Sequence, residues 1–143
     1  MTAVLVDSNV ILDVAGDRPP WATWSSEALD RASANAPLVI NPLIYAEVST
    51  AYARIEELDA ALPESSFRRD ALPYAAGFLA AKAFLIYRQR GGTRTSPMPD
   101  FYIGAHAALA GFRLLTRDPT RYRTYFPSLK LIAPEGAGGP GRN

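Results

Sequence analysis

Short, unbroken apolar runs alternate with longer stretches in which apolar residues recur at helical spacing. The first run, residues 3–6, is rich in β-branched residues and does not alternate with polar ones, so it predicts a strand buried on both faces of a sheet. A further short apolar run at residues 37–40, and the mainly apolar residues 112–115 and 129–132, each with one basic residue, predict three more strands.

Helices are predicted between these strands. Ser8 and Asn9 can begin a first helix that continues through an apolar turn at residues 10–12. Residues 21–35 show a second helical pattern, and the Asn-Pro pair at residues 41–42 is a specific start signal for a third helix. The core face of that third helix is predicted to contain Ile44, Val48, Ala51, Ile55 and Leu58, which indicates one continuous helix.

The second half of the chain is predicted to be mainly helical. Residues 62–90 indicate one or two helices, with first turns near Pro63 and Pro73. A helix that is apolar nearly all round begins at Asp100 and ends near Gly111. One face of the helix that follows Pro73 is expected to contain Phe78, Ala81 and Leu85.

Strands that alternate with helices predict the α/β class, with a mainly parallel sheet between layers of helices. A length of 143 residues suits one domain. We expect this domain to cover residues 1–135 and the glycine-rich residues 136–143 to form a flexible tail.

The composition narrows the chemistry. The chain has no cysteine, which excludes disulfides, thiolate catalysis and zinc–thiolate sites and fits a cytoplasmic protein. No basic stretch precedes the first apolar run, and Asp7 interrupts it, so neither a signal peptide nor a membrane span is expected.

The net charge of +1 conceals a division along the chain. Residues 1–60 contain nine acids and three basic residues, whereas residues 61–143 contain five acids and twelve basic residues. Of the 15 basic residues 13 are arginine, whose planar guanidinium matches the geometry of phosphate. A basic half beside an acidic pocket is what a nucleic-acid hydrolase needs.

Four acids occupy positions from which their side chains can meet. Asp7 and Asp118 follow two of the predicted buried strands. Glu47 lies at the edge of the core face of the third helix, and Asp100 lies in the first turn of its own helix. Because open α/β folds bind ligands at the carboxyl ends of their strands, we expect these four carboxylates to converge at one edge of the sheet.

Each acid also has a purely structural explanation. Asp7 can cap the helix that follows it, and Glu47 can be a solvated helix residue. The helix dipole favours any carboxylate at the position of Asp100, and Asp118 before Pro119 is nearly an ideal cap for a short helical turn. These explanations do not account for the common location of the four acids.

Carboxylates a few Å apart require either raised pKa values or a bound cation. Oxygen donors without cysteine favour Mg²⁺ or Mn²⁺ over zinc, and His106, the only histidine, is more simply a packed helix residue than a ligand. A bound ion of this kind can activate water and offset charge on a phosphate, so phosphodiester hydrolysis is the expected chemistry.

Four segments together resemble the acidic blocks of PIN-domain ribonucleases, most closely the VapC toxins of bacterial toxin–antitoxin pairs: VDSNVILD, NPLIYAEV, PDFYIGAHAAL and LLTRDPTRY. Their order and spacing over residues 4–122 are more specific than any single block. The resemblance implies a PIN-like three-layer α/β/α sandwich with a metal-binding, catalytic quartet and two supporting polar residues. By position, the quartet is Asp7, Glu47, Asp100 and Asp118, and the supporting residues are Asn9 and Thr116.

The resemblance also implies an activity and partners. It predicts Mg²⁺- or Mn²⁺-dependent endonucleolytic cleavage of RNA, a homodimer, and inhibition by a cognate antitoxin whose peptide reaches the active site. Tyr122 stands where the family often has phenylalanine, a difference expected to change the packing little.

We assign expected roles to these residues as a hypothesis. Asp7, Asp100 and Asp118 hold the metal, while Glu47 binds it directly or orients the attacking water. Basic residues near the third and fourth acids are candidate phosphate contacts. They are Arg88, Arg90, Arg94, Arg117, Arg121 and Arg123.

Three alternatives stay open at this point. The chain can be a catalytically silent module that binds RNA or protein, or a housekeeping RNA-processing nuclease without an antitoxin. A phosphatase of the haloacid-dehalogenase type also begins with a strand that ends in aspartate. That chemistry needs a second aspartate two positions after Asp7, where this chain has Asn9.

Overall fold

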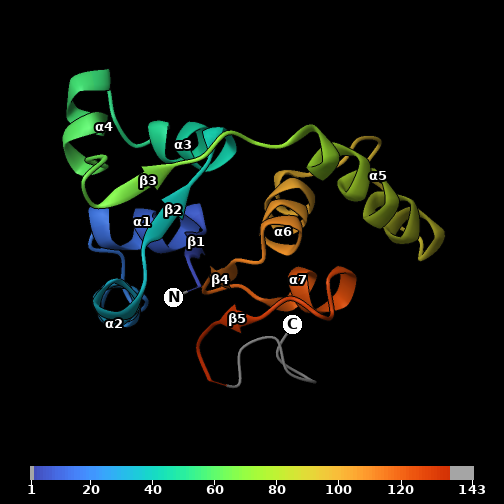
Figure 1. Cartoon of the computed structure of the whole chain (residues 1–143). Helices are drawn as coiled ribbons and strands as arrows, with labels where there is room; N and C mark the ends of the chain where they lie inside the picture. Colours follow the sequence, from blue (N-terminus) through green and yellow to red (C-terminus); the bar gives the residue numbers. More distant parts are fainter. Residues whose placement is uncertain (1, 136–143) are drawn as a thin grey trace.

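The computed structural model describes residues 2–135, in which a five-stranded sheet is flanked by helices (Figure 1). The strands are β1 (Val4–Val6), β2 (Leu38–Ile40), β3 (Phe67–Arg69), β4 (Arg113–Leu115) and β5 (Leu131–Ile132). The helices are α1 (Ser8–Ala15), α2 (Ala22–Asn35), α3 (Pro42–Ser49), α4 (Ile55–Ala61), α5 (Tyr74–Gln89), α6 (Pro99–Ala110) and α7 (Thr120–Tyr125).

The sheet is parallel throughout, with the strand order β3-β2-β1-β4-β5. Strand β1 is at its centre, where Val4 lies opposite Leu38 of β2 and Arg113 of β4. All three residues of β1 are fully buried, as expected of a strand covered on both faces. The predicted α/β class with a parallel sheet between helices is therefore confirmed.

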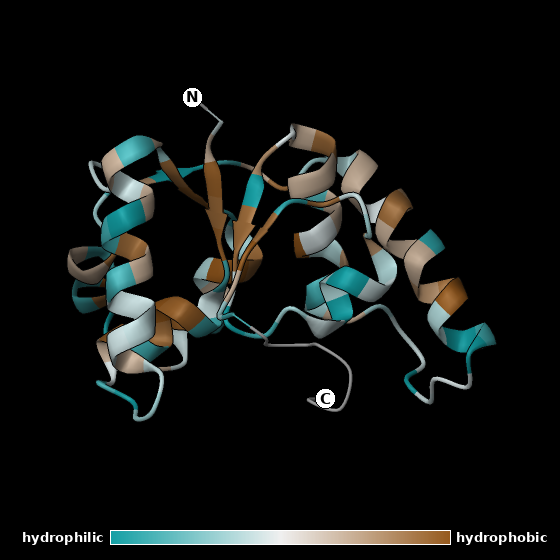
Figure 2. Cartoon of the chain, turned by 90° about the horizontal axis from the view of Figure 1, so that it is seen from below, coloured by the Kyte–Doolittle hydropathy of each residue, from teal (hydrophilic) through white to brown (hydrophobic). Residues whose placement is uncertain are grey.

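The helices form two layers. Helices α1 and α2 pack together on one side of the sheet, and α5, α6 and α7 pack together on the other (Figure 1). Viewed from below, the hydrophobic strands lie between these two groups of helices (Figure 2). Within residues 2–135, no helix is long and apolar enough to cross a membrane.

Two predicted helix boundaries are confirmed by their capping contacts. Asn41 precedes α3, and its Oδ1 accepts a hydrogen bond from the Ile44 backbone N–H at 3.0 Å. Gly111 ends α6 in the left-handed conformation with φ 73°, which glycine adopts without a steric penalty.

The prediction of one continuous helix through Leu58 is wrong, because α3 ends at Ser49 and α4 begins at Ile55. Near this end, the Ser49 hydroxyl donates to the Tyr45 carbonyl and the Thr50 hydroxyl donates to the Glu47 carbonyl, each at 2.7 Å. Side chains that bond to the backbone in this way compete with helix continuation. Ala51 and Ile55, which the prediction put in the core, are consequently exposed.

A helix predicted near Pro63 is replaced by a turn and strand β3, which sequence reasoning missed. This strand pairs with β2 along one edge of the sheet, and two of its three residues are arginine. An edge strand needs no continuous apolar run, since one side of it faces solvent, and charge there discourages unwanted pairing.

The predicted core face of α5 is also wrong. Phe78 and Leu85 are 68% and 51% exposed, while Ala76, Ala80 and Ala83 are buried. Helix α5 packs mainly on α6, and alanines at helical spacing allow the two helices to approach closely. The prediction of a flexible tail concerns residues 136–143, which lie outside the described residues.

Candidate active site

Asp7 lies at the end of the central strand β1 and is 4% exposed. Its Oδ1 accepts a hydrogen bond from the Ser8 backbone N–H at 2.8 Å, so it does cap α1 as the structural explanation supposed. Its Oδ2 accepts from the hydroxyls of Thr116 and Tyr122, each at 2.9 Å. Asp7 is therefore held from three elements: α1, the segment after β4, and α7.

Thr116 and Asn9 link the ends of the two central strands. The Thr116 hydroxyl donates to Asp7 and accepts from the Asn9 side-chain amide at 3.2 Å and from the Asp118 backbone N–H at 3.1 Å. Asn9 Oδ1 in turn accepts from the Arg117 backbone N–H at 3.3 Å. This network fixes the backbone that carries Asp118 beside Asp7.

Ser8 joins Glu47 to this group, a connection that the sequence did not reveal. The Ser8 hydroxyl donates to Glu47 Oε1 at 2.9 Å, although the two residues are 39 positions apart. Ser8 is itself buried, so it holds the partly buried Glu47 carboxylate of α3 near the start of α1. Glu47 was identified from its place at the edge of a helical face, but no pattern in the sequence indicated its partner.

Asp100 lies in the first turn of α6 and faces α7. Its Oδ2 accepts a hydrogen bond from Arg121 Nη1 at 3.1 Å, which forms an ion pair between the two helices. Asp118 is exposed and does not cap α7, because that helix begins after Pro119 without a side-chain cap. The purely structural explanation of Asp118 is therefore wrong.

The electrostatics show that the four acids influence one another. Burial, together with the charges of Asp100 and Glu47, raises the pKa of Asp7 to about 7, against the lowering effect of the Tyr122 and Thr116 hydroxyls. Burial and the Asp100 charge raise the pKa of Glu47. Burial raises the pKa of Asp100, Arg121 opposes that rise, and the Asp118 charge adds to it.

The carboxylate oxygens of the four acids suit a hard divalent cation, although two of these acids are bonded to other side chains in this structure. Within residues 2–135, no three His, Asp or Glu side chains form a group that could hold a metal ion as they stand. Glu47 is bonded to Ser8, and Asp100 is paired with Arg121. The pKa of Asp7 is raised first by burial and then by the charges of Asp100 and Glu47, and a cation would neutralise that negative charge.

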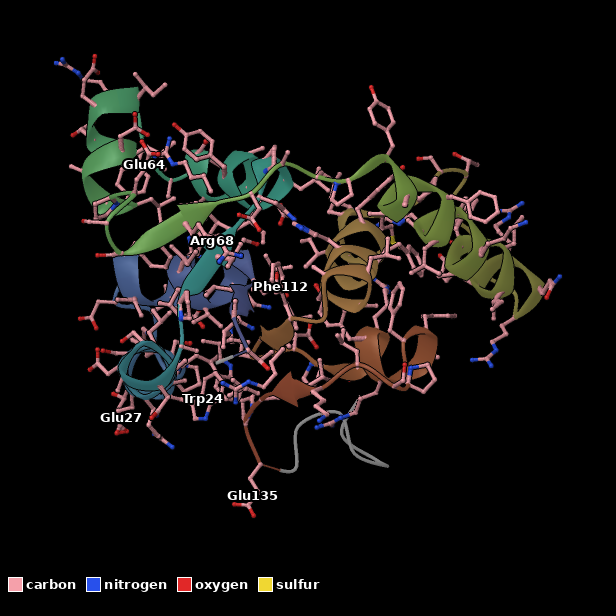
Figure 3. All side chains as sticks on the ribbon, in the orientation of Figure 1. Trp24, Glu27, Glu64, Arg68, Phe112 and Glu135 are labelled. Atoms are coloured by element: carbon pink, nitrogen blue, oxygen red, sulfur yellow. The ribbon has the colours of Figure 1, made fainter. Side chains whose placement is uncertain are left out.

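Three exposed acids do not share this environment. Glu27, Glu64 and Glu135 project outward from the periphery of the molecule (Figure 3) and are exposed. His106 is 2% exposed, and its Nδ1 is hydrogen-bonded to the Asn41 side-chain amide at 3.0 Å. The prediction that His106 is a packed helix residue is thus confirmed.

A cavity of about 290 Å³ opens beside two of the acids. It lies between α5, α6 and α7, and its walls combine carboxylates, hydroxyls, aromatic rings and one guanidinium. The residues that line it are Tyr87, Asp100, Asp118, Thr120, Arg121, Thr124 and Tyr125.

Several of the predicted phosphate contacts have intramolecular partners. Arg121 pairs with Asp100, and Arg117 Nε pairs with the buried Asp13 at 2.7 Å. The Arg88 guanidinium donates to the backbone carbonyls of Gly92 and Arg94. The Arg90 guanidinium lies over the Tyr125 ring, and Arg123 is exposed in the last turn of α7.

The environment of Tyr122 differs from the prediction that tyrosine at this position changes only the packing, and that only a little. It is 1% exposed, and its hydroxyl donates directly to Asp7, so the difference from phenylalanine affects more than packing. The only indication in the sequence that Tyr122 could be a site residue was a polar hydroxyl at an otherwise apolar position. The fold shows which group that hydroxyl meets.

The fold and the grouped acids define a class of protein. The PIN domain family model matches residues 4–127, and the chain belongs to this family. That membership removes the support for a phosphatase of the haloacid-dehalogenase type. A search of curated proteins finds no match.

Solved structures of toxin–antitoxin complexes contain chains with the same fold. A chain in the crystal structure of VapBC2 from Rickettsia felis, bound to a DNA fragment from its promoter, is similar with a TM-score of 0.71 and 16% identity; the match covers 93% of this chain and 99% of that chain. A chain in VapBC-1 from nontypeable Haemophilus influenzae has a TM-score of 0.69 at 16% identity, with 92% and 97% covered. A chain in a toxin–antitoxin complex from Klebsiella pneumoniae has a TM-score of 0.62 at 20% identity, with 90% and 95% covered.

Proposed function

We propose that this protein is a metal-dependent endoribonuclease and the toxin of a toxin–antitoxin pair. The observation that carries the proposal is the environment of Asp7, a buried carboxylate that ends the central strand and carries the electrostatic influence of two further candidate acids. Membership of the PIN family supports nucleic-acid hydrolysis, because PIN domains are generally nucleases that use divalent metals.

The proposed cation is Mg²⁺ or Mn²⁺, held by Asp7, Asp100 and Asp118 with Glu47 as a further ligand or as the residue that orients the attacking water. When bound, such an ion lowers the pKa of water and offsets negative charge on the phosphate. Asn9, Thr116 and Ser8 hold the carboxylates in place through the hydrogen bonds described above.

We propose that RNA lies across the cavity beside Asp100 and Asp118. Arg121 lines the cavity together with Asp100 and Asp118, so its guanidinium can contact a phosphate there. The aromatic and hydroxyl groups of the cavity suit the base and ribose of a single strand. Further phosphate contacts are proposed for Arg88, Arg90, Arg94, Arg117 and Arg123.

The proposed partners follow from the similar structures. Those structures contain VapBC and toxin–antitoxin complexes, which supports a cognate antitoxin for this chain. A homodimer, a cytoplasmic location and a functional domain covering residues 1–135 belong to the same proposal.

Cleavage of a labelled single-stranded RNA tests the proposed activity. Wild-type protein should cleave it with Mg²⁺ or Mn²⁺ and stop when EDTA is added. Asp7→Asn should reduce cleavage more than about 100-fold, because it removes the central charge for the metal. Asp30→Asn is the matched control, since Asp30 is exposed on α2, and it should cleave at the wild-type rate.

Three results would contradict parts of the proposed function. Undiminished cleavage in EDTA would exclude the metal mechanism, and undiminished cleavage by Asp7→Asn would remove that residue from it. RNA binding without cleavage under any metal condition would instead indicate a catalytically silent module. Circular dichroism of Asp7→Asn establishes that a loss of cleavage is not a loss of fold.

A further inference from the structure

The hydroxyl of Tyr122 reaches from α7 to the carboxylate at the end of the central strand. The ring is 1% exposed, and the hydroxyl donates to Asp7 Oδ2 at 2.9 Å across 115 positions of sequence. The chain therefore carries a buried hydroxyl at the centre of its candidate active site.

The hydrogen bonds to Asp7 are divided unequally between its two oxygens. Oδ2 accepts from Thr116 and Tyr122 at 2.9 Å each, and the Asn9 amide lies 3.5 Å from the same atom. Oδ1 accepts from the Ser8 backbone N–H at 2.8 Å. A carboxylate oxygen has two lone-pair directions, so the two short bonds occupy Oδ2, while Oδ1 keeps one direction free.

The surroundings of Tyr122 hold its hydroxyl in place. A Cβ atom added to Gly104 of α6 would lie 3.2 Å from Cδ1 of Tyr122, which shows how closely the ring approaches α6. The hydroxyl of Thr116 also has two other bonds to make, to Asn9 and to the Asp118 backbone. Tyr122 therefore supplies a donor that its neighbours cannot replace without giving up contacts of their own.

We infer that Tyr122 is a positioning residue, which occupies Asp7 Oδ2 together with Thr116 and so leaves Oδ1 as the oxygen for the divalent cation. This inference rests on the metal-dependent nuclease proposed above. Without the Tyr122 hydroxyl, one hydrogen bond fewer holds the Asp7 carboxylate, so the carboxylate rotates more freely. Fixing its orientation for coordination of the ion then costs more free energy. Losses of this kind from groups that orient metal ligands amount to about 10- to 100-fold in metal affinity.

The competing explanation is that the hydroxyl only satisfies a buried carboxylate. In that case Tyr122→Phe changes the stability of the protein but not its affinity for a metal ion. Metal binding in the absence of RNA therefore separates the two explanations, and it does not depend on catalysis.

Calorimetric titration of the metal-free full chain with Mn²⁺ provides the test. Tyr122→Phe should weaken Mn²⁺ binding about tenfold or more. Tyr74→Phe is the control: it also removes a tyrosine hydroxyl, but from a side chain that is fully exposed at the start of α5 and does not line the candidate site. Its Mn²⁺ affinity should stay within about twofold of wild type, well below the tenfold effect.

A second comparison shows whether Tyr122 acts through Asp7. In the Asp7→Asn background, Tyr122→Phe should cause no further loss of Mn²⁺ affinity, because the group that it positions is already gone. Equal Mn²⁺ affinities for wild type and Tyr122→Phe would overturn the positioning role while leaving the nuclease proposal intact. Failure of the wild-type chain to bind Mn²⁺ at all would overturn both.

Discussion

Asp13 shows how a single buried charge can depend on one partner. It is 1% exposed, and its Oδ2 accepts from Arg117 Nε at 2.7 Å and from the Ser25 hydroxyl at 2.9 Å. Its Oδ1 has no hydrogen-bond partner within residues 2–135. Because an unpaired buried carboxylate is costly, Arg117 stabilises the fold whether or not its remaining donors meet RNA.

Replacing Arg117 with alanine should therefore lower the free energy of unfolding by about 3 kcal/mol, the usual cost of breaking a buried ion pair. Arg54→Ala is the control, since Arg54 and Glu56 form an exposed pair with 71% and 70% of their side chains accessible. That change should cost less than about 1 kcal/mol. Urea denaturation measures both values, and equal effects would mean that Asp13 does not depend on its partner.

The sequence predicted the four acids and the supporting residues Asn9 and Thr116, but it did not predict two of the hydroxyls that bond to the acids. Asp7 and Asp118 were recognised because they follow buried strands, and Glu47 because of its place on a helical face. Ser8 and Tyr122 were missed as site residues, since their hydroxyls bond to residues 39 and 115 positions away. A hydroxyl does not reveal in the sequence which distant group it will meet.

At the scale of elements, α6 and α7 are in unusually close contact at Gly104. A Cβ atom there would lie 2.6 Å from the ring of Phe126, near the end of α7. An added Cβ atom at this distance from the Phe126 ring would force α6 and α7 apart. Tyr122 would then move with α7 away from Asp7. The glycine therefore contributes to the geometry of the active site from a position outside it.

Gly104→Ala should destabilise the protein by about 1–3 kcal/mol, as overpacking a core usually does. Gly77→Ala is the matched change in α5, where an added Cβ meets nothing within 4 Å. It should stabilise the chain by about 0.5–1 kcal/mol through helix propensity. Thermal unfolding of both variants provides the comparison, and a stabilising Gly104→Ala would contradict the close packing of α6 and α7.

Elements with a continuous apolar signal were predictable, and those without it were not. Buried strands such as β1 and β2 have apolar runs because both of their faces are covered. The edge strand β3 has the sequence Phe-Arg-Arg and no such signal. For α5, the small residues Ala76, Ala80 and Ala83 are buried while Phe78 and Leu85 are exposed, so the size of the residues misled the assignment of its buried face.

At the scale of the whole molecule, the raised pKa of Asp7 makes stability depend on pH. The unfolded chain releases this proton near the ordinary value of 3.8, whereas the folded chain keeps it until about pH 7. The folded state thus binds more protons between these values, and the free energy of unfolding falls as the pH rises through that window. The raised pKa values of Glu47 and Asp100 act in the same direction.

In EDTA, the metal-free protein should accordingly lose stability between pH 4 and pH 7, by up to about 4 kcal/mol from Asp7. Asp7→Asn should show a smaller loss over the same range, because asparagine does not titrate. Added Mg²⁺ should raise the unfolding temperature more at high pH than at low pH, since the cation takes the place of the proton. Unfolding temperatures that rise with pH in EDTA would be inconsistent with a raised pKa at Asp7.

We propose that acids from distant parts of the chain share one divalent cation. The most direct measurement is an anomalous difference map from a crystal of the full chain soaked in Mn²⁺. We predict a strong peak within bonding distance of Asp7, with oxygens of Glu47, Asp100 or Asp118 completing the site. A well-ordered Asp7 with no Mn²⁺ peak beside it, under conditions in which the protein cleaves RNA, would contradict the account.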